Sequence, residues 1–340
     1  MNINSKRILA LINLGLHIKN YSYNDPKYSK LDSCIEKSII LNKWFTRESI
    51  TNALKSWAYT LDSKNIEKWL SKYQYIENKP RVIGLILAGN IPMVGFHDII
   101  CVWVTGNNAL VKCASKDEVL LPYMTDFLDN EIKCSSFNYV TKINLDFEAI
   151  IATGSNNSAR YFEYYFSAYP NLLRKNRNGI AILDGNETED DLFGLGNDIL
   201  HYFGLGCRNV AKVFLPKGYD LNKIFKGLYK YKEIIHHNKY LNNYDYNKAI
   251  LLMNKKPFLD NGFFLLKEDI ENSTPIGCLN YQYYENTKEV MKEIEKKSNL
   301  IQCIVTNLKV KNAIPFGKSQ QPTLWDYADG IDTINFLQNL

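Results

Sequence analysis

The sequence lacks several features that define whole classes of proteins. It has no apolar run of about 18 residues or more, so no membrane-spanning helix is predicted. No Cys-x-x-Cys pair occurs among its seven scattered cysteines, which favours neither a zinc site nor a disulfide framework. No block of about five like charges occurs, so a nucleic-acid partner is not indicated. These absences predict a cytoplasmic chain with no metal and no membrane span.

What remains is an ordinary globular composition. The chain has 340 residues, enough for about two domains. Its formal net charge of +5 suits an anionic ligand such as coenzyme A or a dinucleotide. The N-terminal stretch Met1–Asn20 is interrupted by polar residues, so it predicts an amphipathic helix and not a signal peptide.

Helical and alternating patterns divide the chain. Residues 1–80 carry apolar residues at helical spacing, most clearly over Leu31–Leu54. Strand and helix patterns alternate from Arg81 on, and again from Gly179 on, which predicts parallel, doubly wound sheets. Strands are expected at Val82–Leu87, Ala109–Lys112, Ala149–Ala152, Ile180–Leu183, Val210–Leu215, Gly262–Leu266 and Ile301–Thr306. Helices are expected at Phe96–Val104, Glu118–Leu128, Ser158–Phe166, Leu192–Phe203, Leu221–Tyr229, Tyr246–Asn254 and Thr287–Lys297.

Two of the junctions between these elements place polar groups after strands. Asn90 follows the first strand, where its amide suits an oxyanion or simply a turn. Gly154 and Ser155 lie between a strand and a helix whose first N–H groups suit a pyrophosphate, although a plain helix cap has the same pattern. The Gly-x-Gly-x-x-Gly fingerprint is absent. Asp117 and Glu118 are acidic residues of the kind that open a helix.

A third junction holds a candidate nucleophile. Cys207 follows Gly204-Leu205-Gly206 and precedes a strand, a point of close backbone approach. The adjacent Arg208 would lower the pKa of its thiol. Taken alone, one thiol among seven is more often structural. Lys112, at the end of its strand, suits a ribose or phosphate as well as a surface position.

The order of these junctions resembles the aldehyde dehydrogenase superfamily. Within it, the chain is most similar to the bacterial acyl-CoA reductase family, which includes the luminescence-type fatty acyl-CoA reductases. The matching runs are Ala88–Pro92 (AGNIP), Asn108–Met124, Ala152–Phe162 (ATGSNNSARYF), Phe203–Pro216 (FGLGCRNVAKVFLP) and Phe316–Leu337.

The resemblance implies a fold, two domains and a role for each matching residue. The fold would be two doubly wound α/β domains. Residues 1–180 would hold the helical region and the cofactor domain, to which residues 311–340 would return, and residues 181–310 would be the catalytic domain. The implied residues are Cys207 as nucleophile, Asn90 as oxyanion donor, Lys112, Ser115, Gly154 and Ser155 at the cofactor, and Phe316 at the substrate entrance.

Two departures from the superfamily narrow the implied reaction. Hydrolytic members carry a Glu that activates water, whereas Leu172–Gly179 has no carboxylate here. This favours reduction of an acyl-CoA to an aldehyde and free CoA through a cysteine thioester. NAD-preferring members often carry a Glu shortly after the lysine, whereas Ser115 and Lys116 stand here and would tolerate a 2′-phosphate. NADPH is therefore expected in preference to NADH.

The resemblance leaves other readings open. A CoA-acylating aldehyde dehydrogenase runs the same chemistry in reverse, and an acyl-phosphate reductase shares the superfamily. The alternative that is not an enzyme is a non-catalytic member of the superfamily that only binds a nucleotide. Besides the acyl-CoA substrate, partners left open are a second copy of the chain and an acyl-activating or acyl-transferring enzyme.

Overall fold

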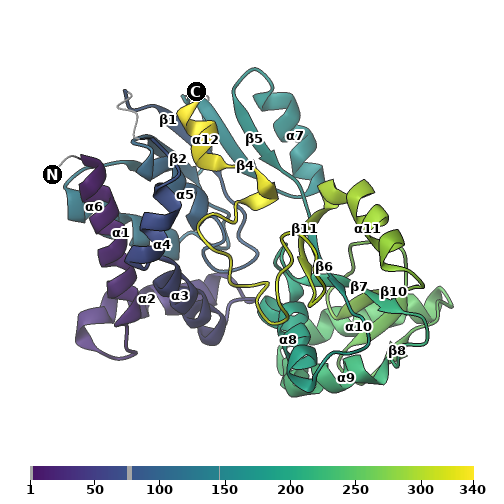
Figure 1. Cartoon of the computed structure of the whole chain (residues 1–340). Coiled ribbons are helices and arrows are strands. Elements are labelled where there is room, and N and C mark those ends of the chain that lie inside the picture. Colours follow the sequence, from purple (N-terminus) through teal and green to yellow (C-terminus); the bar gives the residue numbers. More distant parts are fainter. Residues whose placement is uncertain (1–2, 75–78, 145) are drawn as a thin grey trace. The chain divides into compact units, whose positions relative to one another are not determined.

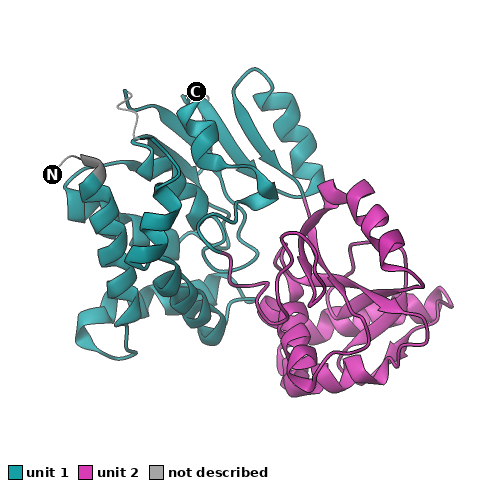
Figure 2. Cartoon of the chain, in the orientation of Figure 1, with its two compact units in different colours: residues 1–175, 323–340 teal, residues 176–322 magenta. Residues whose placement is uncertain are grey.

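The computed structural model describes residues 3–74, 79–144 and 146–340, with side chains described from residue 5 on. The chain divides into two units (Figure 2). Unit 1 comprises Met1–Lys175 and Thr323–Leu340, and unit 2 comprises Asn176–Pro322. The functional assignment of residues 1–180 and 181–310 stays a prediction. No helix among the described residues is long and apolar enough to cross a membrane.

Unit 1 is a parallel five-stranded sheet with a helical N-terminal region (Figure 1). The strand order is β3-β2-β1-β4-β5. The strands are β1 (Val82–Ile86), β2 (Asn108–Lys112), β3 (Phe137–Tyr139), β4 (Ala149–Thr153) and β5 (Asn171–Arg174). The helices are α1 (Ile3–Lys19), α2 (Ser29–Leu41), α3 (Arg47–Thr60), α4 (Ser63–Leu70), α5 (Phe96–Val104), α6 (Leu120–Ile132), α7 (Asn156–Phe166) and α12 (Thr333–Gln338), with short 3-10 turns η1 (Pro26–Tyr28) and η5 (Ala328–Gly330).

Burial explains why β1, β2 and β4 were predicted from the sequence, whereas the edge strands β3 and β5 were not. The central residues of β1 and β2 and nearly all of β4 are buried, as expected for parallel strands covered on both faces. The C-terminal segment is tied to this unit by buried polar contacts. The indole of Trp69 donates to the hydroxyl of Tyr327 at 2.7 Å, and Arg174 donates to Thr333 at 3.0 Å. Helix α12 accordingly packs against α5 (Figure 1).

The predicted helical stretch Leu31–Leu54 is two helices. Asn42 breaks it, because its side-chain oxygen accepts from the N–H of Trp44 at 3.0 Å and its amide donates to the carbonyl of Gly89 at 3.3 Å. Thr46 then begins α3 with a capping box that includes Ser49. This break joins the helical region to the loop after β1.

Unit 2 contains a six-stranded sheet in the order β11-β6-β7-β10-β9-β8. All pairs are parallel except β8 with β9. The strands are β6 (Asn178–Ile182), β7 (Val210–Pro216), β8 (Leu259–Asp260), β9 (Leu265–Glu268), β10 (Cys278–Tyr284) and β11 (Ile301–Val305). The helices are α8 (Glu189–Leu200), α9 (Asn222–Leu228), α10 (Asn238–Met253) and α11 (Thr287–Lys296), with 3-10 segments η2 (His201–Gly204), η3 (Tyr229–His236) and η4 (Ser298–Leu300). The mixed architecture of parallel sheets and helices confirms the predicted fold class.

Candidate functional site

The loops after three adjacent strands of unit 1 meet at one edge of its sheet. In the register, Ile86 of β1 lies opposite both Lys112 of β2 and Ala152 of β4. The carboxyl ends of the three strands are therefore level. The strand order reverses direction between β1 and β4, which is where open α/β sheets bind their ligands.

Asn90 lies exposed in the loop that follows β1, residues 87–95, here called the Asn90 loop. The neighbouring loop after β2, residues 113–119, is here called the Ser115 loop. The N–H of Met93 donates to the buried carboxylate of Asp117 in the Ser115 loop at 2.8 Å. The Asn90 loop is therefore held on one side by Asn42 and on the other by Asp117. Asn90 itself is exposed at the carboxyl end of β1.

Lys112 is the last residue of β2 and is half-buried, and Ser115 is exposed three residues later. The expected opening of the following helix by Asp117 and Glu118 is wrong. Helix α6 begins at Leu120 without an acidic first turn, and its N-cap Val119 makes no side-chain hydrogen bond. Asp117 instead turns inward to the Asn90 loop, because the N–H of Met93 offers it a buried donor.

Gly154 and Ser155 form the turn between β4 and α7. The hydroxyl of Ser155 caps the helix by accepting from the N–H of Ser158 at 3.2 Å. A Cβ on Gly154 would lie 2.8 Å from the Cβ of Ser158 and 2.9 Å from the ring of Phe162, so only glycine lets the turn pack on the helix. The first turn of α7 thus begins directly after the carboxyl end of β4.

The segment Leu172–Gly179, which lacks a carboxylate, contains a buried arginine. Arg174 ends β5 and forms an ion pair with Asp98 of α5, with 2.5 Å between Nη1 and Oδ2. Both side chains are about 5% exposed. The adjoining residues up to Gly179 include no carboxylate. Asp98 is committed to the ion pair, so it does not replace the missing base.

In unit 2, Cys207 lies in the turn between η2 and β7. All seven cysteines belong to the described part of the chain, and Cys207 alone among them is exposed. The backbone leading to it is left-handed at Tyr202, Phe203 and Gly204, with φ of 51°, 60° and 75°. Two of these residues carry a side chain, so the turn is held against a preference of about 1 kcal/mol each.

Burial separates the other thiols from Cys207. It raises the pKa of Cys113 and of Cys278 to about 12, and that of Cys101 well above its ordinary value. A thiol that stays protonated is a poor nucleophile. Within unit 2, Cys207 is therefore the cysteine best placed to react.

Asn209 holds the Cys207 turn and was not singled out from the sequence. Its side chain is buried and donates to the carbonyls of Asp198, Ile199 and His201 at 3.0, 3.3 and 2.9 Å. Its amide oxygen accepts from the N–H of Gly206 at 2.8 Å. One amide thus satisfies the last carbonyls of α8 and fixes the residue before Cys207.

Phe316 lies in a segment that is tied to the same turn. The buried carboxylate of Asp198 accepts from the N–H groups of Gly317 at 2.7 Å and Ser319 at 2.9 Å. Arg208, next to Cys207, donates from Nε to the carbonyl of Ser319 at 2.6 Å. Unit 2 therefore joins the Phe316 segment to the Cys207 turn through three side-chain contacts.

In open α/β sheets ligands bind at the carboxyl ends of the strands, as proposed for unit 1, but the Cys207 turn does not lie at such an end. It lies before β7, where Gly179 of β6 donates from its N–H to the carbonyl of Asn209 at 2.9 Å. Cys207 therefore lies at the amino edge of its sheet, and the carboxyl-end rule gave no reason to choose it.

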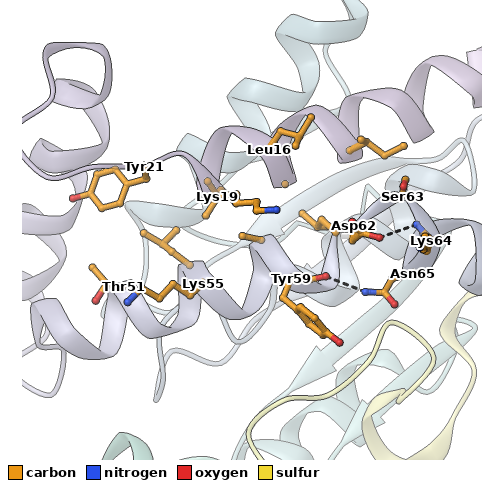
Figure 3. Close-up of a pocket in the computed structure, with 16 residues that line it drawn as sticks. Leu16, Lys19, Tyr21, Thr51, Lys55, Tyr59, Asp62, Ser63, Lys64 and Asn65 are labelled. Carbon is orange, nitrogen blue, oxygen red and sulfur yellow. Dashed lines mark hydrogen bonds between the residues drawn. The ribbon is translucent and has the colours of Figure 1, made fainter.

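A groove of about 890 Å³ lies elsewhere in unit 1, between α1, α3 and α4 (Figure 3). Leu16 and Lys19 of α1, Lys55 of α3 and Lys64 after Asp62 are among its lining residues. None of the residues predicted for the site lines it. In the described part of the chain, no three His, Cys, Asp or Glu side chains group in a way that could hold a metal ion.

No family model matches the chain. Its sequence is similar to a long-chain acyl-protein thioester reductase of Aliivibrio fischeri, with 24% identity over 236 residues, 62% of this chain and 48% of the relative. The chain thus spans about half the length of the curated relative that it matches.

Solved structures are similar over most of the chain. A NAD+ complex of an aldehyde dehydrogenase from Bacillus cereus gives a TM-score of 0.63 at 13% identity, covering 91% of this chain and 73% of that one. An indole-3-acetaldehyde dehydrogenase from P. syringae, in complex with NAD+ and IAA, gives 0.66 at 11% identity, with 92% and 74% covered. These comparisons confirm the predicted resemblance: the chain has the fold of the aldehyde dehydrogenases.

Proposed function

We propose that the protein reduces a long-chain acyl thioester to the aldehyde with NADPH, through an acyl thioester on Cys207. The observation that carries the proposal is the exposed Cys207, held in a left-handed turn by Asn209 while burial keeps Cys101, Cys113 and Cys278 protonated. The fold and the similarity to a thioester reductase support an oxidoreductase that acts on acyl or aldehyde groups.

In the first step, the Cys207 thiolate attacks the thioester carbonyl of acyl-CoA. The new carbon–sulfur bond forms as the bond to the CoA sulfur breaks, and the CoA thiolate leaves and takes up a proton. The resemblance assigns the oxyanion that develops to the N–H of Cys207 and the side-chain amide of Asn90, which would stabilise it. Each donor contributes about 3 kcal/mol to lowering the barrier.

A nicotinamide dinucleotide supplies two electrons as hydride to the acyl carbon. Lys112, Ser115, Gly154 and Ser155 would hold the dinucleotide, and the N-terminus of α7 would offer its N–H groups to the phosphates. Asn90 and the Cys207 N–H stabilise the second oxyanion as they did the first. The carbon–sulfur bond to Cys207 then breaks, the aldehyde leaves past Phe316, and the thiolate is restored.

The absence of a carboxylate at Leu172–Gly179 supports reduction over hydrolysis. With no residue there to remove a proton from water, the acyl-enzyme persists until hydride or CoA reaches it. The end of β5 holds Arg174 in a buried ion pair, which offers water no base. The oxidative, CoA-acylating direction is the reverse of the same reaction and uses the same residues.

The proposal also concerns the group that carries the acyl thioester, which is CoA or, as the alternative, a protein. The relative from Aliivibrio fischeri is named for an acyl-protein thioester, which favours a protein-bound acyl group as the alternative to acyl-CoA. An acyl-transferring enzyme would then be the partner. An acyl phosphate would require the same nucleophile and differs only in the leaving group.

A labelling and turnover assay tests the proposal. Acyl-CoA labelled in its acyl group should label wild-type protein covalently and leave Cys207→Ala unlabelled, and NADPH oxidation should match aldehyde formed. Acyl-CoA, acyl-protein thioester and acyl phosphate are compared as donors. Labelling that survives in Cys207→Ala, or NADPH oxidation without aldehyde, would contradict the proposal.

A further inference from the structure

The Asn90 loop and the Ser115 loop are packed together without intervening side chains. The N–H of Leu87 donates to the carbonyl of Lys112 at 3.0 Å, which extends the strand pairing to the first residue of the Asn90 loop. A Cβ on Gly89 would lie 2.7 Å from the Cβ of Ala114 and 3.2 Å from that of Asp117. Because neither loop has room to slide past the other, a displacement of one displaces the other.

Asp117 makes the polar contact between the two loops. Its Oδ2 accepts from the N–H of Met93 at 2.8 Å, and Oδ1 is buried with no hydrogen-bond partner among the described residues. Burial raises the pKa of this carboxyl to about 7, against the effect of the Met93 hydrogen bond. In this buried, low-dielectric position the hydrogen bond is electrostatically stronger than it would be in water.

Met93 needs this hydrogen bond. Its φ is 55°, a left-handed conformation that a residue with a side chain adopts at a cost of about 1 kcal/mol or more. Met93 is also buried and lies three positions after Asn90. The turn of the Ser115 loop is closed by the N–H of Asp117, which donates to the carbonyl of Ala114 at 2.9 Å. Asp117 therefore moves with Ser115 and takes Met93 with it.

We propose that Asp117 is a positioning residue that couples dinucleotide binding at Lys112 and Ser115 to the orientation of Asn90. This inference rests on the proposed function, in which those two loops serve the cofactor and the oxyanion. A dinucleotide that fixes the Ser115 loop fixes the Met93 backbone, and with it the loop that presents the Asn90 amide. Linkage requires the converse, so a thioester bound against Asn90 tightens dinucleotide binding.

Rates of Cys207 acylation test the coupling. Acylation by labelled acyl-CoA is followed by rapid quench with and without NADP+, which cannot donate hydride. NADP+ should accelerate acylation of the wild type, and Asp117→Ala should lose that acceleration and acylate up to about a hundredfold more slowly. Asp117→Asn keeps an oxygen acceptor for Met93 and should restore both. Gly89→Ala, which wedges the loops apart, should repeat the defect.

Asp129 supplies the matched control. It also accepts from a backbone N–H in unit 1, that of Ser136 at 3.0 and 3.1 Å, but next to the start of β3, Phe137–Tyr139. Asp129→Ala should lose stability and keep the NADP+ response. An unchanged response in Asp117→Ala, or an equal loss in Asp129→Ala, would overturn the inference.

Hydrogen exchange gives a readout that does not depend on turnover. NADP+ should slow exchange of the amides of residues 88–95 in the wild type, in Asp117→Asn and in Asp129→Ala, but not in Asp117→Ala. Protection that persists in Asp117→Ala would refute the coupling. If the wild type is not acylated at all, the proposed function fails, and the exchange result then decides on the coupling by itself.

Discussion

The side-chain amide of Asn209 donates to the carbonyl of His201 at 2.9 Å, across the turn that carries Cys207. The same amide group reaches the carbonyls of Asp198 and Ile199, so one side chain ends α8 and begins the approach to β7. The turn contains left-handed residues with side chains, which makes it unfavourable by itself. The position of the proposed nucleophile thus depends on a residue two places further along the chain.

Asn209→Ala should therefore weaken both stability and acylation. Three buried carbonyls and one N–H lose their partner, which predicts a loss of about 2–4 kcal/mol in the free energy of unfolding. Denaturant unfolding and the acylation rate are measured together, and the rate should fall about tenfold or more. Asn247→Ala is the control, since that buried amide donates to the carbonyl of Ile276 at 2.9 Å, away from the turn. Equal acylation defects in both variants would contradict the role of Asn209.

Thiol reactivity should single out Cys207. It is exposed, whereas burial raises the pKa values of Cys34, Cys101, Cys113, Cys134 and Cys278. Iodoacetamide at neutral pH should modify one cysteine quickly in the folded protein, and peptide mapping should identify it as Cys207. Modification should block later acylation by acyl-CoA. Faster reaction at any other cysteine would remove the main support for the nucleophile.

The sequence predicted strands with a continuous apolar run and missed others, among them the edge strands β3, β5 and β8 and the inner strand β10. The central residues of β1 and β2 are buried, as their apolar runs indicated. Strand β10 reads CLNYQYY and was missed, although it pairs with both β7 and β9. Its Asn280 is fully buried and donates to the carbonyls of Glu271 and Ser273, and its register neighbour Lys212 is buried and donates to the half-buried Glu293. A hydrophobic pattern cannot reveal a strand that is buried through polar partners.

The residues of the candidate site also differ in how they could be found from the sequence. Asn90, Lys112, Gly154 and Ser155 follow strands that the sequence predicted, and the register brings those strand ends level. Cys207 was found through resemblance to a family. Asn209 and Asp117 were missed as supporting residues because their partners are backbone groups, which every residue type carries and no sequence motif marks. Only the folded chain shows which N–H or carbonyl such a side chain meets.

Ser115→Glu tests the predicted preference for NADPH. A carboxylate at position 115 itself would repel a 2′-phosphate and would accept from ribose hydroxyls, so kcat/KM should fall for NADPH by about tenfold or more and hold or rise for NADH. The control is Ser135→Glu, the same change at an exposed serine just before β3. It should leave the ratio of the two kcat/KM values unchanged. A wild type that prefers NADH would contradict the cofactor assignment directly.

Asp117 should lower the free energy of unfolding as pH rises, which is opposite to the effect of a carboxyl group whose pKa is lowered by folding. Burial, partly opposed by the hydrogen bond from Met93, raises the pKa of its carboxyl to about 7, whereas the unfolded chain has the ordinary value of about 3.9. The folded state therefore binds this proton more tightly than the unfolded state. The contribution of Asp117 to the free energy of unfolding should fall as pH rises from about 4 to about 7 and stay constant above that.

Comparison with Asp117→Asn isolates this dependence, because every other titrating group is shared by the two proteins. The variant should gain stability relative to the wild type as pH rises across that window, by up to about 4 kcal/mol. Denaturant unfolding at several pH values between 4 and 8 measures the difference. Asp129→Asn, at a carboxyl that also accepts from a backbone N–H, should show no such gain. A difference between wild type and Asp117→Asn that is independent of pH would mean that Asp117 is ionised at all these pH values, in contact with water or a cation.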